Sequence, residues 1–242
     1  MAGMTESGAV PFFHDVEPVQ RVRDDLLDVH FTGASTDRRP AVIFVHGMAE
    51  DAEPRPRDWD VFRGYGALAA ASGLVGVTFD HRLHSGGHFP HAAADVAAVV
   101  ERTRALEVVD GDRVLLWFFS LGGALAAPWL PEPPPWLRGI ALSYPVLAPP
   151  PDWPGDVARF DAVAAVSAHP GLPKLLVRVG DEIEWLAGTQ DAFVARARDA
   201  DAALEVIELP DAAHGFEGHG HDPVARAAVD RAMRWAADAL TG

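Results

Sequence analysis

Short apolar runs alternate with amphipathic segments along most of the chain, and this pattern predicts strands and helices in alternation. The run AVIFV at 41–45 is fully apolar, as expected of a strand buried inside a parallel sheet. Alternating strands and helices favour βαβ units, and therefore an α/β fold with a doubly wound, mostly parallel β-sheet flanked by helices. The predicted strands are 23–31, 41–45, 74–79, 113–119, 139–144, 174–179 and 204–209, and the predicted helices are 59–72, 92–106, 188–200 and 223–240.

Two stretches depart from this alternation. In LLDVHF, the apolar Leu27, Val29 and Phe31 alternate with Asp28 and His30, which predicts an antiparallel edge strand with one face in water. The proline-rich segment that begins at residue 145, with a short helix around 156–167, predicts a lid-like excursion over the sheet around 145–170.

The domain organisation follows from the length of the chain and from where linkers or polar stretches could divide it. Residues 1–20 are polar and without period, so we expect an extended lead-in there. No linker or repeat divides the remainder, and 242 residues are enough for one continuous core. Residues 21–242 are therefore expected to form a single domain.

Charge and composition exclude several classes of function. The formal net charge of −15 would repel nucleic-acid phosphates and anionic lipids, so we expect neither a nucleic-acid nor a membrane partner. The chain has no cysteine, which excludes thiolate metal ligands and a cysteine nucleophile. The start MAGMTESGAV lacks the pattern of a signal peptide, and no apolar run reaches the roughly 20 residues of a membrane helix. These observations favour a cytoplasmic protein.

The stretch RVLLWFFSLGGALAAP at 113–128 offers the most specific chemistry. Its apolar run breaks at Ser120 and continues in helix-forming residues, which predicts a strand, a sharp turn and a helix. A serine there stands at a helix amino terminus, where free N–H groups and the dipole favour an oxyanion. The plainer interpretation is a buried strand whose serine caps the next helix.

This stretch resembles the nucleophile elbow of the α/β-hydrolase superfamily, with Ser120 as the nucleophile. Gly122 matches the family pattern after the serine, whereas Phe118 stands where the family usually has glycine. We expect the Phe118 ring to fill space left by small neighbours, so that the elbow keeps its shape.

The rest of the chain strengthens the resemblance. The stretches VRVGDE and AAHGF resemble the acid and histidine loops of dienelactone-hydrolase-like and carboxylesterase-like members, and FDHRLHSGGHFPHAAAD resembles a segment of the hormone-sensitive-lipase-like branch. The superfamily order of nucleophile, acid and histidine then implies Ser120, Asp181 and His214. Glu184 and Glu182 remain alternatives to Asp181, because family members often carry an extra residue before the acid.

The resemblance implies a serine hydrolase for small, soluble carboxylic esters or lactones that works through an acyl-enzyme without a cofactor. His214 would be the general base, and the N–H groups of Met48 and Leu121 would form the oxyanion hole. Two alternatives stay open: a catalytically weak protein of this fold that binds a small ligand, and an acyltransferase or lyase that uses the same serine. The oligomeric state stays open as well.

Other side chains admit functional interpretations that we consider weaker. Glycine and proline around 84–91 place three histidines in a loop, where hydrogen bonding is favoured over a metal, and no metal site is predicted. Arg82 is expected to tie loops together. Two histidines near 220 are expected in a solvated loop or helix cap, and three tryptophans are candidates for a pocket or for the core. These histidines and tryptophans are His84, His88, His91, His219, His221, Trp129, Trp153 and Trp185.

Overall fold

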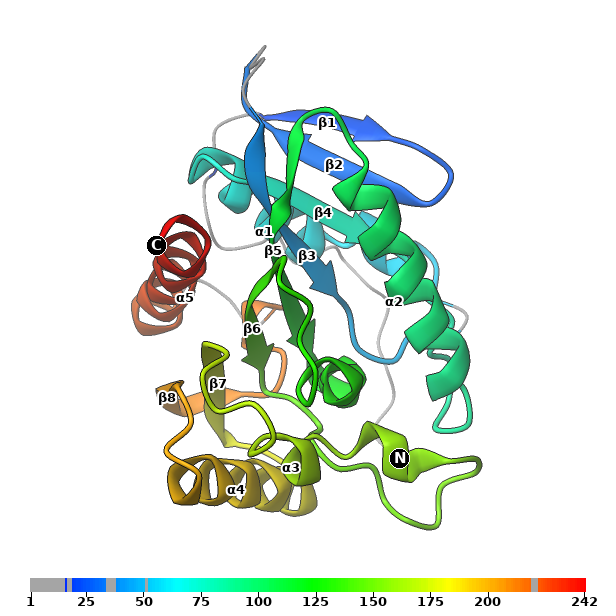
Figure 1. Cartoon of the computed structure of the whole chain (residues 1–242), viewed down its shortest axis with the longest axis vertical. Helices are drawn as coiled ribbons and strands as arrows, with labels where there is room; N and C mark the ends of the chain where they lie inside the picture. The colour runs from blue at the N-terminus through cyan, green and yellow to red at the C-terminus, as the bar shows by residue number, and fades with distance from the viewer. Residues whose placement is uncertain (1–15, 17–18, 34–37, 51, 219–221) are drawn as a thin grey trace.

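The computed structural model describes residues 16, 19–33, 38–50, 52–218 and 222–242. Its centre is an eight-stranded sheet with the strand order β1-β2-β4-β3-β5-β6-β7-β8 (Figure 1). The strands from β4 to β8 in this order pair in parallel, whereas β1 and β2 pair antiparallel at one edge. The strand bounds are β1 Gln20–Arg23, β2 Leu27–Phe31, β3 Arg39–Val45, β4 Val75–Phe79, β5 Val109–Phe119, β6 Leu137–Ser143, β7 Lys174–Asp181 and β8 Leu204–Ala213.

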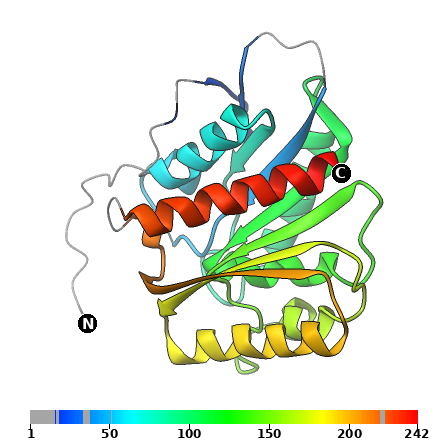
Figure 2. The same cartoon turned by 90° about the vertical axis from the view of Figure 1, so that its left-hand side faces the viewer.

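Helices cover both faces of the sheet, which confirms the predicted doubly wound α/β fold. Helices α1 and α5 lie together on one face in Figure 2, while α2 lies across the sheet from α5 in Figure 1. The α-helices are α1 Asp60–Ala71, α2 Phe89–Arg104, α3 Ala162–Ala165, α4 Glu184–Asp199 and α5 Pro223–Thr241, and the 3₁₀ helices are η1 Pro56–Asp58, η2 Ser120–Trp129, η3 Val157–Phe160 and η4 Phe216–Gly218.

The central strand β5 contributes buried side chains to the cores on both faces of the sheet. Its successive side chains point to opposite faces, so Phe118 joins the core under α2 and α4 while Trp117 and Phe119 join the core under α1 and α5. Phe118 is fully buried and has no exposed surface. Because both faces of β5 are covered, the strand needs an unbroken apolar run.

The antiparallel edge differs from its prediction. The sequence pattern placed Asp28 and His30 in water, but both are buried, at 0% and 2% exposure. One reason is that α1 covers this face, with Gly66 against the His30 ring. The other is that β1, too short to predict from the sequence, forms the outer strand and brings Arg21 and Arg23 onto Asp28. Hydrogen bonds from Arg23 and Arg21 outweigh burial and hold the pKa of the Asp28 carboxyl below its ordinary value.

The same two arginines reach beyond the sheet. Arg21 and Arg23 also pair with Asp58 in η1, just before α1 begins. The network of Arg21, Arg23, Asp28 and Asp58 therefore joins the sheet edge to the segment that leads into α1.

The excursion between β6 and β7 contains η3 and α3. Its aromatic side chains lie on α2, since Phe89 stacks on Phe160 at 5.0 Å and on Trp153 at 6.2 Å.

The expected lead-in over 1–20 lies outside the described residues except for residues 16, 19 and 20, and the single domain over 21–242 stays a prediction. None of the helices in the described ranges is long and apolar enough to cross a membrane.

Candidate active site

Three side chains from three loops form a hydrogen-bonded chain at the carboxyl edge of the sheet. Ser120 Oγ lies 2.8 Å from His214 Nε2, and His214 Nδ1 lies 2.8 Å from Glu182 Oε2. Because an ionised carboxylate only accepts, the Nδ1–H of His214 donates to Glu182 and the Nε2 lone pair faces the serine hydroxyl. This tautomer can accept a proton from Ser120.

The expected acid, Asp181, does not contact His214, and Glu182 occupies that position. Strand β7 continues through Asp181, which pairs with Ala213 on β8 and has an exposed side chain. Successive residues of a strand point to opposite sides, so the next side chain, Glu182, turns inward and is only 1% exposed. The other alternative, Glu184, begins α4 and is exposed.

The backbone at Ser120 has the geometry of an elbow despite Phe118. Ser120 has a φ of 50°, a left-handed conformation that is strained for a residue with a side chain. A Cβ on Gly122 would lie 2.3 Å from the carbonyl oxygen of His46, so the close approach of these backbones requires glycine. The helix that follows is 3₁₀ over its whole length and contains Pro128.

The loop after β3 lies directly against the serine. A Cβ on Gly47 would lie 2.9 Å from the Cβ of Ser120, which shows how close the two backbones are. Met48 follows Gly47 and is half exposed, whereas Leu121 is buried. The two expected oxyanion donors therefore belong to neighbouring segments, the loop after β3 and the start of η2.

Two stacked histidines support this loop. The rings of His46 and His81 are 3.6 Å apart and nearly parallel, and both side chains are buried. His46 Nδ1–H donates to the Gly47 carbonyl at 2.6 Å, and His46 Nε2 accepts from the His81 N–H at 3.2 Å. His81 Nε2–H donates to the His46 carbonyl at 2.9 Å, and its Nδ1 accepts from the Leu83 N–H at 3.3 Å. Burial lowers the pKa of His81 to about 4 and the pKa of His46 well below its ordinary value.

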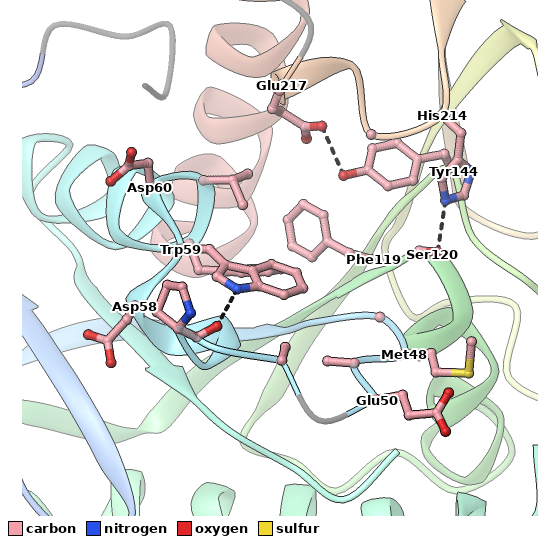
Figure 3. Close-up of a pocket in the computed structure, with 18 of the residues that line it drawn as sticks. Met48, Glu50, Asp58, Trp59, Asp60, Phe119, Ser120, Tyr144, His214 and Glu217 are labelled. Carbon is pink, nitrogen blue, oxygen red and sulfur yellow. Dashed lines mark hydrogen bonds between the residues drawn. The ribbon is translucent and has the colours of Figure 1, made fainter. Parts of the chain in front are cut away.

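A cavity of about 930 Å³ opens beside Ser120 and His214. Figure 3 shows Trp59 across the cavity from Ser120, with Phe119 between them. The Trp59 indole is held by a 2.7 Å hydrogen bond from Nε1 to the Pro54 carbonyl. The described lining includes five carboxylate residues and no lysine or arginine: Glu50, Glu53, Asp58, Asp60 and Glu217.

Comparison with known proteins identifies the family. Residues 36–208, more than half of the chain, match the family described as Serine aminopeptidase, S33. The chain belongs to this family. The matched segment of this α/β-hydrolase includes Ser120 and Glu182 and ends before His214. A search of curated protein sequences found no match.

Solved structures of esterases share the fold of this α/β-hydrolase. EstE1, a thermostable carboxylesterase cloned from a metagenomic library, is 19% identical with a TM-score of 0.73 over 94% of this chain and 90% of its own. An esterase from the archaeon Pyrobaculum calidifontis is 15% identical with a TM-score of 0.73 over 93% and 87%. Thermogutta terrifontis esterase 2, in a form phosphoramylated by tabun, is 19% identical with a TM-score of 0.70 over 96% and 98%. The expected resemblance to the hormone-sensitive-lipase-like branch is consistent with these neighbours.

Sequence reasoning about the hydrolase missed two residues beside His214. The ring of Tyr144 lies edge-on to the His214 ring at 4.7 Å between centroids, and its hydroxyl donates to Glu217 at 2.9 Å. Tyr144 has a φ of 38°, a left-handed value that is unusual for tyrosine. The only sequence signal was a glutamate three positions after the proposed base.

The remaining candidates have mostly structural roles. Arg82 binds Asp95 on α2 through both its guanidinium and its backbone N–H, so it ties its loop to a helix and not, as expected, to another loop. The stretch around 84–91 is not all loop, since α2 begins at residue 89 and includes His91. His84 hydrogen-bonds to the Ala49 carbonyl, and His88 lies 3.3 Å from the Ser85 hydroxyl.

The last candidates from the sequence are the two histidines near 220 and the three tryptophans. The histidines expected in a solvated loop or cap, His219 and His221, lie outside the described residues. Trp153 and Trp185 contact each other edge-on at 6.4 Å, and Trp129 contacts Trp136. The described cavity is lined by Trp59 in place of the three tryptophans that the sequence suggested.

Proposed function

We propose that this protein is a serine hydrolase that cleaves carboxylic esters of small molecules without a negative charge through an acyl-enzyme. The observation that carries the proposal is the hydrogen-bonded chain from Ser120 through His214 to Glu182, with the serine in strained elbow geometry. The likeness of the fold to known carboxylesterases supports an ester as the substrate.

In the first half-reaction, Ser120 Oγ attacks the ester carbonyl carbon as its proton passes to His214 Nε2. Glu182 keeps the Nδ1–H of His214 in place and stabilises the imidazolium that forms. The N–H groups of Met48 and Leu121 stabilise the tetrahedral oxyanion. The C–O bond to the alcohol then breaks as His214 returns the proton to the leaving oxygen.

The second half-reaction repeats these steps with water. His214 takes a proton from water as its oxygen attacks the acyl carbon, and the acid is released when Ser120 regains its proton. No cofactor takes part in this scheme. The lactones suggested by the sequence would react in the same way, with the acid and alcohol remaining in one molecule.

The cavity favours substrates that carry no negative charge and are larger than the smallest esters. Its volume of about 930 Å³ lies near the upper end of the range for small-molecule sites, and Trp59, Phe119 and Tyr144 supply apolar walls. Glu50 and Glu53 lie in this lining and are exposed, so an anionic substrate would be repelled. The expectation of no nucleic-acid partner and the cytoplasmic location stay predictions.

Probe labelling and ester turnover test the proposal directly. We expect a fluorophosphonate probe to label the wild-type protein at Ser120 and to leave the Ser120→Ala variant unlabelled. The tabun adduct of the Thermogutta terrifontis esterase supports the choice of an organophosphorus probe. Wild-type protein should also hydrolyse aryl esters of uncharged acids, and mass spectrometry of the quenched reaction should find the acyl group on Ser120.

The two alternatives predict different results. A protein that only binds ligands would show neither labelling nor turnover, and this outcome would remove the hydrolase proposal. An acyltransferase would be labelled, but it would transfer the acyl group to an added alcohol or amine much faster than to water.

A further inference from the structure

A second glutamate lies in the cavity wall beside the proposed triad and has no part in the scheme above. Glu217 is 1% exposed, and its two carboxyl oxygens accept hydrogen bonds from Tyr65 at 2.7 Å and from Tyr144 at 2.9 Å. Each carboxyl oxygen thus accepts from one phenol hydroxyl, a pattern that an ionised carboxylate can satisfy.

A buried carboxylate without a cation is costly for a protein to maintain. Among the residues that the structure describes, no lysine or arginine forms an ion pair with Glu217. Glutamine has almost the same shape and could fill the same space without the charge. The charge of Glu217 therefore calls for an explanation other than packing.

The nearest group that gains a positive charge in the proposed reaction is His214. Figure 3 shows Glu217 and His214 on opposite sides of the Tyr144 ring, joined to that ring by a hydrogen bond and by an edge-on contact respectively. Burial, the largest influence, raises the pKa of the Glu217 carboxyl, and His214 is one of the groups that oppose this rise, so the two side chains lie close enough to interact electrostatically. Because Glu217 is buried and His214 is only partly exposed, this attraction is screened less than between two surface groups.

We propose that Glu217 is a positioning residue that supplies a second negative charge to the His214 imidazolium and holds Tyr144 against the histidine ring. This inference rests on the proposed function of Ser120 and His214. Glu182 would fix the tautomer by direct contact, while Glu217 would act across the Tyr144 ring. The specific consequence is that the acid limb of the pH profile depends on Glu217.

Titratable groups from several elements face Glu217 and His214. The described groups that face His214 are Ser120 after β5, Tyr144 after β6, Glu182 after β7 and Glu217 on its own loop. Those that face Glu217 are Tyr65 on α1, Tyr144 and His214. Burial raises the pKa of both phenols well above the ordinary value, so neither changes charge in the working range. Glu182 and Glu217 are then the two negative charges near the base.

The test compares pH profiles of kcat/KM for an aryl ester. Glu217→Gln removes a negative charge near His214, so the acid limb should move about one pH unit lower. The kcat value should fall about tenfold, because a change of one unit in the pKa of His214 corresponds to a tenfold change in equilibrium. KM should change little. Glu217→Asp keeps the charge and should keep the acid limb at its wild-type position. Tyr65→Phe is the matched control, since it removes one hydrogen bond to Glu217 but keeps both the charge and Tyr144.

The outcomes separate this inference from the proposed function. If the wild-type protein is active but Glu217→Gln leaves the acid limb in place, or Tyr65→Phe shifts it equally, Glu217 is only structural and the inference is overturned. If the wild-type protein neither labels nor turns over ester, the proposed function fails and the inference fails with it.

A measurement on the wild-type protein covers the case in which Glu217→Gln does not fold. In ¹³C NMR of protein labelled at glutamate carboxyl carbons, Glu217 should be ionised throughout the pH range of full activity. A protonated Glu217 in that range would overturn the inference.

Discussion

The two groups of histidines at the carboxyl edge of the sheet use the same side chain in opposite ways. His214 is 34% exposed and lies between a hydroxyl that can release its proton and a carboxylate that favours the imidazolium. His46 and His81 are buried, and each ring accepts a hydrogen bond from a backbone N–H that cannot change its role. Protonation would turn that acceptor nitrogen into a donor facing another donor. The partners of an imidazole therefore decide whether it is a base or a fixed support.

The largest effect should follow from removing the proton acceptor. We expect His214→Ala to lower kcat for an aryl ester on the order of 10⁶-fold, as in serine hydrolases that lose the base. The free energy of unfolding should change little, because the ring is partly exposed. Steady-state kinetics and urea unfolding measure the two quantities. A loss of only a few-fold would mean that His214 is not the base.

Replacing the acid should have the next largest effect. Glu182→Gln keeps the shape but favours the wrong tautomer of His214, so kcat should fall about 10⁴-fold, the size seen for the corresponding change in a serine protease. Asp181→Asn and Glu184→Gln are controls that should stay within a few-fold of wild type, since both side chains are exposed. An equal loss in Asp181→Asn would return the acid assignment to Asp181.

The buried pair of His46 and His81 should make the free energy of unfolding depend on pH. A histidine with a depressed pKa binds protons better in the unfolded chain than in the folded one. Its contribution to the free energy of unfolding is therefore complete above pH 6.5 and is lost as the pH falls toward 4. For His81, with a pKa of about 4, this amounts to about 3 kcal/mol of unfolding free energy. His30, also with a pKa of about 4, adds to the same trend.

Urea unfolding between pH 4 and 7.5 measures this prediction. Glu217 changes the free energy of unfolding with pH in the opposite direction, because its pKa is raised. The contribution of His81 is therefore best measured as the difference in unfolding free energy between wild type and His81→Gln. The variant should be less stable at pH 7.5 and should lose less stability on acidification. His169→Gln changes an exposed histidine and should keep the wild-type slope. Equal slopes for wild type and His81→Gln would contradict the prediction.

Much of the fold could be predicted because its strands are buried on both faces and therefore read as apolar runs. The positions of Ser120 and His214 followed from the order of motifs along the chain, and the structure brings the two side chains within 2.8 Å. The carboxylate that contacts His214 lies one residue after the predicted Asp181, because the end of β7 depends on its pairing with β8. A shift of one residue on a strand reverses the side to which a side chain points.

The cluster around Glu217 could not be predicted for a different reason. Tyr65, Tyr144 and Glu217 are distant in sequence and meet only because α1, β6 and the histidine loop converge at one edge of the sheet. The burial of Asp28 was missed for a similar reason, since its arginine partners lie on a strand of only four residues. Contacts of this kind depend on tertiary structure and leave no periodic signal in the sequence.

The network of Arg21, Arg23, Asp28 and Asp58 has a consequence for anyone who redesigns the cavity by loop exchange. Asp58 lines the cavity, but its countercharges come from β1, at the far antiparallel edge and before the start of the matched family segment at residue 36. A grafted loop that omits Asp58 would leave Arg21 and Arg23 with one carboxylate fewer to share, while a graft into a chain without β1 would bring an uncompensated charge to the cavity wall. The wall and the outer strand are therefore best exchanged together, as one transferable unit.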